Sequence, residues 1–440
     1  MGVSPGLLLF EISFASFHGV DLFYFARVDM SLPDKRRDES VGVAMRKWLF
    51  GFLTVVVCAL VAVALTLDKH VRYLLTNPPT DTEVLFWSTP QRDAAFRSMD
   101  WFSFVADSNP IAAGEDVLDL PAGEPLAIDL DVDEYIQDQR TAGLVVLQDG
   151  EVRLERYGLD FDEQGRWTSF SVAKSITSTL VGAAIKDGYI KSIDDKVTEY
   201  IPDLRGSAYD EVSIRPLLTM SSGVRWNEDY EDKNSDVARF NEHAAEPGVD
   251  LTVSYMRQLP RDVPAGSKWL YNTGETNLIG VLVSSATGKT LSEYLSEKIW
   301  APYGMQQDGS WLLGSTGHEI SGCCVQAATR DFARFGQFIM DGAQVNGESI
   351  VPDDWFESAT RKQQDIGYPG EGYGYQWWTF DDGTYAAQGI FGQAIFIDPQ
   401  RKLVIASNSN WPTATDGEGL GRQRDAFYRA VQEALDAENQ

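Results

Sequence analysis

The sequence predicts an α/β fold in which one sheet is assembled from strands at both ends of a large domain, with a helical region inserted between them. Two observations support this prediction. β-Rich runs occur in residues 142–158 and again in residues 386–410, and between them a long apolar run from Val172 to Ile185 suits a helix buried on most sides. The 440 residues, 43% of them hydrophobic, are enough for one large domain or two modest ones.

Residues 142–158, AGLVVLQDGEVRLERYG, predict a β-hairpin that leads directly into the apolar helix. Its two runs contain Val145, Val146, Val152, Leu154 and Tyr157. The turn between them is Asp149-Gly150, a favoured two-residue hairpin loop. The first half of the sheet is therefore expected before residue 160.

Further helices are predicted in the middle of the chain and one at its end. They are residues 194–204, broken by Pro202, residues 213–226, ended near Gly223, residues 290–305, stopped by Pro302 and Gly304, residues 328–340, with Asp331 near the start, and a final helix from Gly421 to Ala437. Residues 386–410 predict a second hairpin that turns at Asp398-Pro399.

The N-terminal region predicts a membrane anchor or a signal peptide at residues 45–67. The uncharged run at residues 48–67 has the length needed to cross a bilayer, so the membrane is an expected partner. The basic residues that precede it favour a cell-membrane protein whose domain lies outside the cytoplasm. Ala62-Val63-Ala64 could be a cleavage site, in which case the domain would be secreted; because the run continues beyond it, we favour the uncleaved anchor.

Three other segments complete the expected organisation. We hypothesise that residues 1–44 are an extension produced by the choice of start site, with Met45 as the true start. Residues 68–125 are rich in proline, aspartate and aromatic residues and are interpreted as a linker and wrapping arm. Residues 126–440 are expected to form the main domain.

Composition excludes one class of partner and says little about redox state. A net charge of −28 argues against a nucleic-acid-binding surface. No obligate protein partner is indicated, and no Cys/His spacing predicts a zinc site. Cys323 and Cys324 are adjacent, a geometry that disfavours a disulfide between them.

Ser171 and Lys174 form an S-x-x-K pattern at the predicted start of the apolar helix. Residues three apart share a helix face, so the amine can reach the hydroxyl. Burial and the helix N-terminus both disfavour the lysine cation, and a neutral lysine can act as a general base toward serine. The alternative is an ordinary surface lysine, since about one or two such patterns are expected by chance in a chain of this composition.

Other nucleophile schemes find less support in the sequence. There is no G-x-S-x-G motif and no H-E-x-x-H motif. The chain has four histidines, and neither His243 nor His318 has an obvious acidic partner beside a nucleophile signature. A base other than histidine is therefore favoured.

Two further segments supply candidate site residues. Tyr271 could relay a proton between Ser171 and the leaving group, with the Lys174 charge keeping the pKa of the phenol low; the alternative is a half-buried aromatic residue before a helix. Gln388, Gly389 and Ile390 are expected at a strand edge, where glycine permits close approach. The N–H groups of Ser171 and Ile390 could form an oxyanion hole, although plain packing is the usual role of such a segment.

Together, S-V-A-K at Ser171–Lys174, Y-N-T at Tyr271–Thr273 and the glycine-containing segment after residue 387 resemble the serine β-lactamase/penicillin-binding-protein superfamily. The resemblance covers roughly residues 80–435 and is strongest to the class C branch, in particular to its 6-aminohexanoate-dimer hydrolases and esterases. It implies a β-lactamase/transpeptidase-like three-layer αβα sandwich, with a mainly antiparallel sheet and a helical subdomain. It also implies an acyl-enzyme on Ser171, activated by Lys174 and Tyr271, with no metal or organic cofactor.

Departures from the family pattern narrow the expected substrates. Thr273 stands where the family has an amide, and Gln388-Gly389-Ile390 lacks the cation or hydroxyl that holds a substrate carboxylate. These changes favour carboxylic esters, or amides resembling 6-aminohexanoate oligomers, without a carboxylate near the scissile bond.

The acidic segment 227–236 could face a substrate ammonium group, with Tyr230 and Asp236 as candidates, or could be a solvated loop. Two alternative functions remain open from the sequence: a β-lactamase or DD-peptidase acting on peptidoglycan-type substrates, and a binding protein that kept the fold without the chemistry.

Overall fold

A computed structural model describes residues 38–79, 84–100, 107–416 and 419–438, and the chain divides into two units, Met1–Leu67 and Asp68–Gln440. In the first unit, helix α1 spans Asp38–Thr66. Across the described residues no helix combines the length and the apolar character needed to cross a bilayer, so the predicted span at residues 48–67 is not supported. Most of the predicted extension, residues 1–37, lies outside the described residues.

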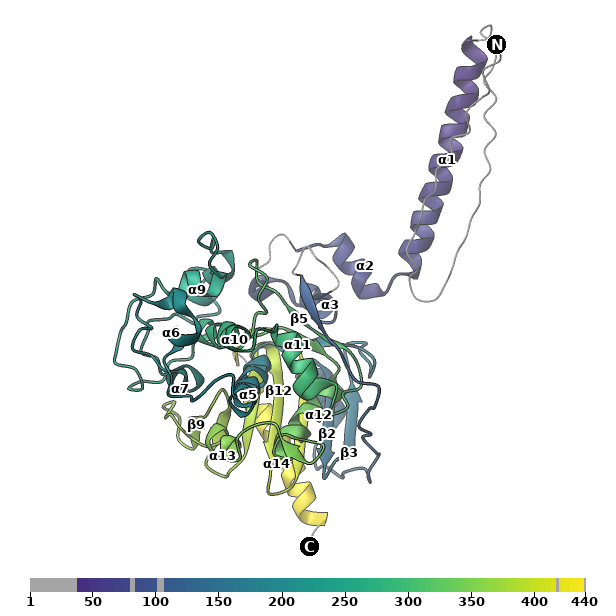
Figure 1. Ribbon diagram of the computed structural model, residues 1–440. Coiled ribbons are helices and arrows are strands. Elements are labelled where there is room, and N and C mark those ends of the chain that lie inside the picture. Colours follow the sequence, from purple (N-terminus) through teal and green to yellow (C-terminus); the bar gives the residue numbers. More distant parts are fainter. Residues whose placement is uncertain (1–37, 80–83, 101–106, 417–418, 439–440) are drawn as a thin grey trace. The chain divides into compact units, whose positions relative to one another are not determined.

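The second unit is built on a seven-stranded sheet with the order β3-β2-β13-β12-β11-β10-β9, in which every neighbouring pair is antiparallel (Figure 1). The strands are β2 Thr141–Gln148, β3 Glu151–Tyr157, β9 Glu371–Tyr373, β10 Trp378–Phe380, β11 Tyr385–Gly389, β12 Gln393–Asp398 and β13 Leu403–Ser409. β2 pairs directly with β13, so the two predicted hairpins lie side by side in one sheet. The prediction of one sheet built from both ends is confirmed.

Helices cover both faces of this sheet, as alternation along β2 requires. Val145 and Leu147 share a core with helix α5, Val172–Lys186, and helix α12, Thr329–Met340. Leu144 and Val146 face the other way. They pack with helix α4, Val132–Asp138, and helix α14, Leu420–Glu438. The protein therefore has the predicted three-layer αβα sandwich.

The helices that follow α5 and precede β5, Gly309–Leu312, in the chain form the predicted helical region. Their bounds are α6 Val197–Tyr200, η2 Pro202–Leu204, α7 Ile214–Leu218, α8 Asp236–Arg239, η3 Phe240–Glu242, α9 Leu251–Met256, α10 Thr273–Thr287 and α11 Leu291–Leu295. The helix predicted at residues 213–226 is shorter than expected because Met220, at φ 54°, leaves the helical region soon after α7. The helix predicted at residues 290–305 is α11 followed by a π-helical turn, Ser296–Trp300.

The segment before the main sheet is hydrogen-bonded to the rest of its unit. It contains α2 Lys69–Thr76, η1 Val84–Phe86, α3 Thr89–Ala95 and β1 Ser108–Ile111. β1 pairs with β5, Gly309–Leu312, in a second sheet with the order β1-β5-β6-β4. Arg92 of α3 donates to Asn410 Oδ1 at 2.9 Å, just beyond β13.

The remaining elements are short. They are β4 Trp167–Thr168, β6 Val325–Ala327, β7 Gln344–Val345, β8 Glu348–Ser349, α13 Trp355–Ala359 and η5 Ile390–Gly392. β4 ends shortly before Ser171, and η5 begins at Ile390; both residues are candidates from the sequence.

Candidate active site

Ser171 is the N-cap residue of α5, immediately before Val172, and follows β4 and a tight turn. Phe170 in that turn has φ 41°, a left-handed conformation that a bulky residue rarely adopts. Such a backbone persists only where the surrounding packing holds it, and it is common at functional sites. The turn brings the Ser171 side chain, 8% exposed, to the wall of a cavity.

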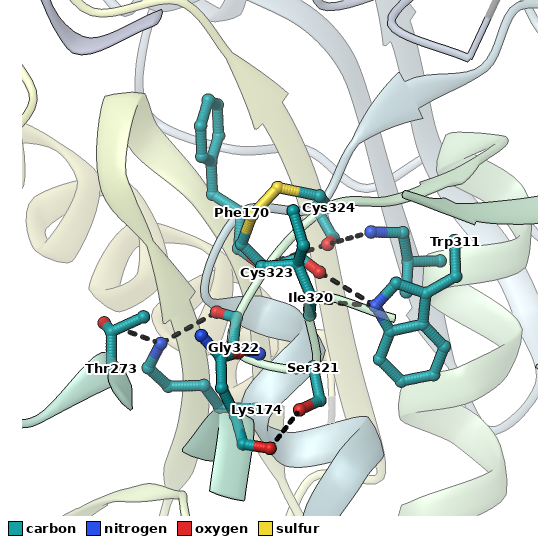
Figure 2. Close-up of a disulfide and its surroundings, with 12 residues drawn as sticks. Phe170, Lys174, Thr273, Trp311, Ile320, Ser321, Gly322, Cys323 and Cys324 are labelled. Atoms are coloured by element: carbon teal, nitrogen blue, oxygen red, sulfur yellow. Dashed lines mark hydrogen bonds between the residues drawn. A yellow bond between two sulfur atoms is a disulfide. The ribbon is translucent and has the colours of Figure 1, made fainter. Parts of the chain in front are cut away.

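Lys174 lies in the first turn of the same helix and is 1% exposed. Its Nζ donates to Thr273 Oγ1 at 3.0 Å and to the Gly322 carbonyl at 2.7 Å (Figure 2). A Cβ at Gly322 would lie 3.1 Å from Lys174 Nζ and 2.9 Å from Thr273 Cγ2, so a glycine is needed here to leave space for the amine. Lys174 is therefore a buried amine held by two neutral acceptors, not an ordinary surface charge.

The pKa of Lys174 is lowered from 10.5 to about 8, because burial disfavours the cation; the negative charge of Glu228 acts in the opposite direction. At neutral to mildly basic pH a useful fraction of the amine is therefore neutral. A neutral amine next to a serine can accept its proton.

Tyr271 precedes α10 and lies against Trp378 of β10, with the two rings stacked at 5.7 Å between centroids. Lys174 Nζ is 5.3 Å from the centre of the Tyr271 ring. Burial raises the pKa of the Tyr271 phenol, as does the Glu228 charge, while a hydrogen bond with Ser171 acts the other way. The structure thus brings Tyr271 to Ser171, but the prediction that Lys174 keeps the pKa of this phenol low is wrong, because burial is the larger effect.

The end of β11 lies against the start of α5. A Cβ at Gly389 would lie 2.9 Å from the Ser171 nitrogen and 2.8 Å from the Ser169 carbonyl oxygen, so glycine permits this approach. Among the described residues, neither the Ser171 N–H nor the Ile390 N–H has a hydrogen-bond acceptor. Both N–H groups are therefore available to a ligand at this edge.

Glu228 is a site residue that the sequence reasoning missed. It accepts hydrogen bonds from the Thr273 N–H at 2.9 Å and from the Tyr230 hydroxyl at 2.7 Å. The Trp226 indole and the Thr273 hydroxyl also donate to it. It lies in the acidic segment that drew attention in the sequence, but no spacing signal distinguishes it from the neighbouring acidic residues.

Ser171, Glu228, Tyr271 and Ile390 line one cavity of about 430 Å³. Of the other predicted binding residues, Tyr230, Gln388 and Gly389 also line it. Thr273 does not, but its N–H donates to Glu228, which does. Asp236 is not among the lining residues; it accepts from the Asn227 N–H at 2.8 Å and from the Tyr255 hydroxyl at 2.6 Å.

A second missed residue is Arg424 of α14, which also lines the cavity. Its Nη2 donates to Gln388 Oε1 at 3.1 Å. The strand itself carries no cation at this point, yet the fold brings one from a helix more than 30 residues later in the chain. Sequence spacing gives no signal for this pairing.

Cys323 and Cys324 form a disulfide directly after Gly322 (Figure 2). The prediction against a bridge between adjacent cysteines is therefore wrong. Cys324 adopts φ 77°, and this left-handed turn brings the two side chains together.

No group of three His, Cys, Asp or Glu side chains in the described part of the chain is arranged to hold a metal ion.

Comparisons with known proteins identify the family. The family model named Beta-lactamase matches residues 128–429, so the chain belongs to the β-lactamase family. A 6-aminohexanoate-dimer hydrolase of Paenarthrobacter ureafaciens is 31% identical over 350 residues, which cover 76% of this chain and 88% of that protein.

Solved structures share the fold. A Bacillus anthracis protein provisionally named a 6-aminohexanoate-dimer hydrolase has a TM-score of 0.68 at 23% identity, covering 79% of this chain and 94% of that one. A family VIII carboxylesterase has a TM-score of 0.52 at 16% identity, covering 69% of this chain and 99% of that one. The protein is a serine hydrolase of this superfamily, with amidases and esterases among its neighbours.

Proposed function

We propose that this protein cleaves ester or amide bonds through an acyl-enzyme on Ser171, activated by Lys174 and Tyr271. The observation that carries the proposal is the state of Lys174: a fully buried amine in the first turn of α5, with its pKa lowered to about 8. A structural lysine gains nothing from this position, whereas a general base requires a neutral form near the working pH.

The proposed reaction uses groups that line one cavity or adjoin it. Neutral Lys174 takes the Ser171 proton as Oγ attacks the carbonyl carbon, and the N–H groups of Ser171 and Ile390 receive the oxyanion. The Tyr271 phenol, protonated and hydrogen-bonded to Ser171, gives its proton to the leaving group and regains one from protonated Lys174, so that Lys174 is neutral again. Lys174 then takes a proton from water as the water attacks the acyl-enzyme, and Ser171 is released.

The substrates we propose are carboxylic esters and linear amides of the 6-aminohexanoate type. The support is the relative named as a 6-aminohexanoate-dimer hydrolase and the absence of a lysine or threonine in Gln388-Gly389-Ile390. The location outside the cytoplasm stays a prediction from the sequence.

One observation favours a second candidate, a β-lactamase or DD-peptidase that acts on substrates with a carboxylate. Arg424 donates to Gln388 and lines the cavity, so a cation is present beside the strand that lacks its own. Matched substrate pairs that differ only by a carboxylate or a carboxamide separate the two candidates. A preference for the carboxylate that is lost in Arg424→Gln, but kept in Arg429→Gln on the exposed side of the same helix, would favour the second.

The test of the proposed chemistry is covalent labelling of the full chain with a fluorophosphonate probe. We expect one adduct, mapped by mass spectrometry to Ser171, absent in Ser171→Ala and strongly slowed in Lys174→Ala. Lys186→Ala, at the other end of α5, is the control and should label at the wild-type rate. A folded wild-type protein without an adduct would contradict the proposal and favour the binding-protein alternative.

A further inference from the structure

We propose that Glu228 is a positioning residue: through Thr273 it directs the hydrogen bonds of Lys174 so that the amine lone pair stays free for Ser171. This inference rests on the proposed function, in which Lys174 is the base. It goes beyond that function by assigning a role to a carboxylate that does not touch the reacting atoms.

The first step is that Glu228 has no acceptor capacity left for a substrate. An ionised carboxylate has about four lone-pair sites. Four donors already occupy them: the Trp226 indole and the Thr273 N–H on Oε2, and the hydroxyls of Tyr230 and Thr273 on Oε1. Although Glu228 lines the cavity, it is therefore fixed in place and does not serve as a ligand for a substrate ammonium group or as a base.

The second step concerns the Thr273 hydroxyl. A hydroxyl has one proton to donate and can accept through its lone pairs. Because Thr273 donates that proton to Glu228, toward Lys174 it can only accept, and it does so from Nζ at 3.0 Å. Glu228 thus sets the direction of the hydrogen bond between Thr273 and Lys174.

The third step counts the hydrogen-bonding capacity of neutral Lys174. A neutral amine has two N–H donors and one lone pair. Thr273 Oγ1 and the Gly322 carbonyl take the two N–H groups, which leaves the lone pair for the Ser171 proton. Without the Glu228 acceptor, the Thr273 hydroxyl can rotate, donate to the lone pair and occupy the base.

Glu228 also supplies the charge that faces this amine. Around Lys174, α10 contributes Thr273, the loop before β6 contributes the Gly322 carbonyl, and Tyr271 contributes a neutral phenol. Among the described residues, Glu228 is the charged group that acts on the pKa of Lys174, and it raises it. Removing this charge should favour neutral Lys174 at lower pH while disordering its hydrogen bonds.

The two effects give Glu228 a signature that a purely structural residue lacks. We would measure the second-order rate constant of fluorophosphonate labelling against pH for the full chain and for Glu228→Gln. We expect the plateau rate to fall about tenfold or more, and the acid limb to move toward lower pH by about one unit. Asp229→Asn, one residue along in the same acidic segment and exposed, is the control and should leave both unchanged.

A double-mutant cycle tests whether Glu228 acts through Thr273. In Thr273→Val the hydroxyl is gone, so adding Glu228→Gln should slow labelling little further. If the two substitutions slow labelling additively, Glu228 does not act through Thr273. If Glu228→Gln keeps the wild-type plateau rate and the wild-type acid limb of the pH profile, Glu228 has no positioning role. If Glu228→Gln does not fold, the labelling rates of Thr273→Ser and Thr273→Val replace it. The serine variant keeps the hydroxyl and should label at the wild-type rate, whereas the valine variant should label more slowly. Equal labelling rates of the two variants would contradict the inference. Failure of the proposed function is distinct, because wild type would then give no Ser171 adduct at all.

Discussion

Lys174, the base in the proposed reaction, carries an energetic cost. Its pKa is lowered from 10.5 to about 8, so the folded state disfavours the proton that the unfolded chain binds readily. For a group whose folded pKa is lowered in this way, the cost is full below about pH 8 and disappears as the pH rises toward 10.5. The residue that the proposed chemistry needs is therefore one that opposes folding at neutral pH.

This cost predicts that Lys174→Met stabilises the protein. Methionine has a similar shape without the charge, and the free energy of unfolding at pH 7 should rise by up to about 3 kcal/mol. Urea unfolding at pH 7 and pH 10 measures it, with a smaller gain at pH 10. The half-exposed Lys186 at the end of the same helix gives the control, since Lys186→Met should change stability by less than about 0.5 kcal/mol. A loss of stability in Lys174→Met at both pH values would contradict this account.

Gly389 gives the second prediction at this scale. A Cβ there would meet the Ser169 carbonyl at 2.8 Å and the Ser171 nitrogen at 2.9 Å, so Gly389→Ala should push the end of β11, with the Ile390 N–H, away from the Ser171 N–H and separate the two proposed oxyanion donors. We expect labelling of Ser171 to slow by about a hundredfold. Circular dichroism and the melting temperature show whether the fold is kept. A variant that folds and labels at the wild-type rate would argue that these N–H groups are not used.

The sequence allowed the prediction of residues whose signal is local and missed those whose partners are distant. Ser171 and Lys174 share one helical turn, and Tyr271 stands in a recognisable triplet, so all three candidates could be named in advance. Glu228 is recognised as a site residue only through its contact with Thr273, 45 residues away, and Arg424 only through its contact with Gln388. Such pairings depend on how the elements pack, which short-range patterns do not encode.

Among the elements, strands and helices with strong periodicity were predicted and irregular ones were not. The hairpin at Asp149-Gly150 and helices α5, α12 and α14 lie where the patterns place them, because each buries one face or most of its surface. The segment at residues 213–226 was overextended because the left-handed turn at Met220 depends on its surroundings. The Cys323–Cys324 disulfide was predicted not to form because adjacent cysteines have an unfavourable geometry for a bridge, and that prediction was wrong.

Helix α12 packs so closely on the sheet that it requires a glycine. A Cβ at Gly336 would lie 2.5 Å from Val404 Cγ1 and 2.7 Å from Ile395 Cγ2. In an isolated helix Gly→Ala adds about 1 kcal/mol of stability. Here we expect Gly336→Ala to lower the free energy of unfolding by about 1–2 kcal/mol, because overpacking exceeds the helix preference. Denaturant unfolding measures whether the free energy of unfolding falls or rises. A rise would show that α12 can shift to accommodate the methyl group without a cost in stability.

The whole molecule carries a net charge of −28, with 65 acidic residues against 37 basic ones. Repulsion among these charges opposes the compact state and is screened by salt. We expect the melting temperature to rise by several degrees between about 10 mM and 0.5 M salt at pH 7. Sodium chloride and choline chloride should act alike if screening is the cause. A rise with only one of them would indicate binding of a particular ion.

The pairing of β2 with β13 has a consequence for the newly made chain. A ribosome releases Ser171, Lys174 and the β2–β3 hairpin more than 200 residues before β13 emerges. Until then, β2 lacks its inner neighbour and exposes an apolar edge of the kind that pairs with other chains. The proposed nucleophile is thus translated early, but the sheet against which its helix packs is completed only near the end of synthesis. Because Gly389 and Ile390 also arrive late, a chain stalled before β11 carries the serine without one of the two backbone groups that the proposed reaction needs.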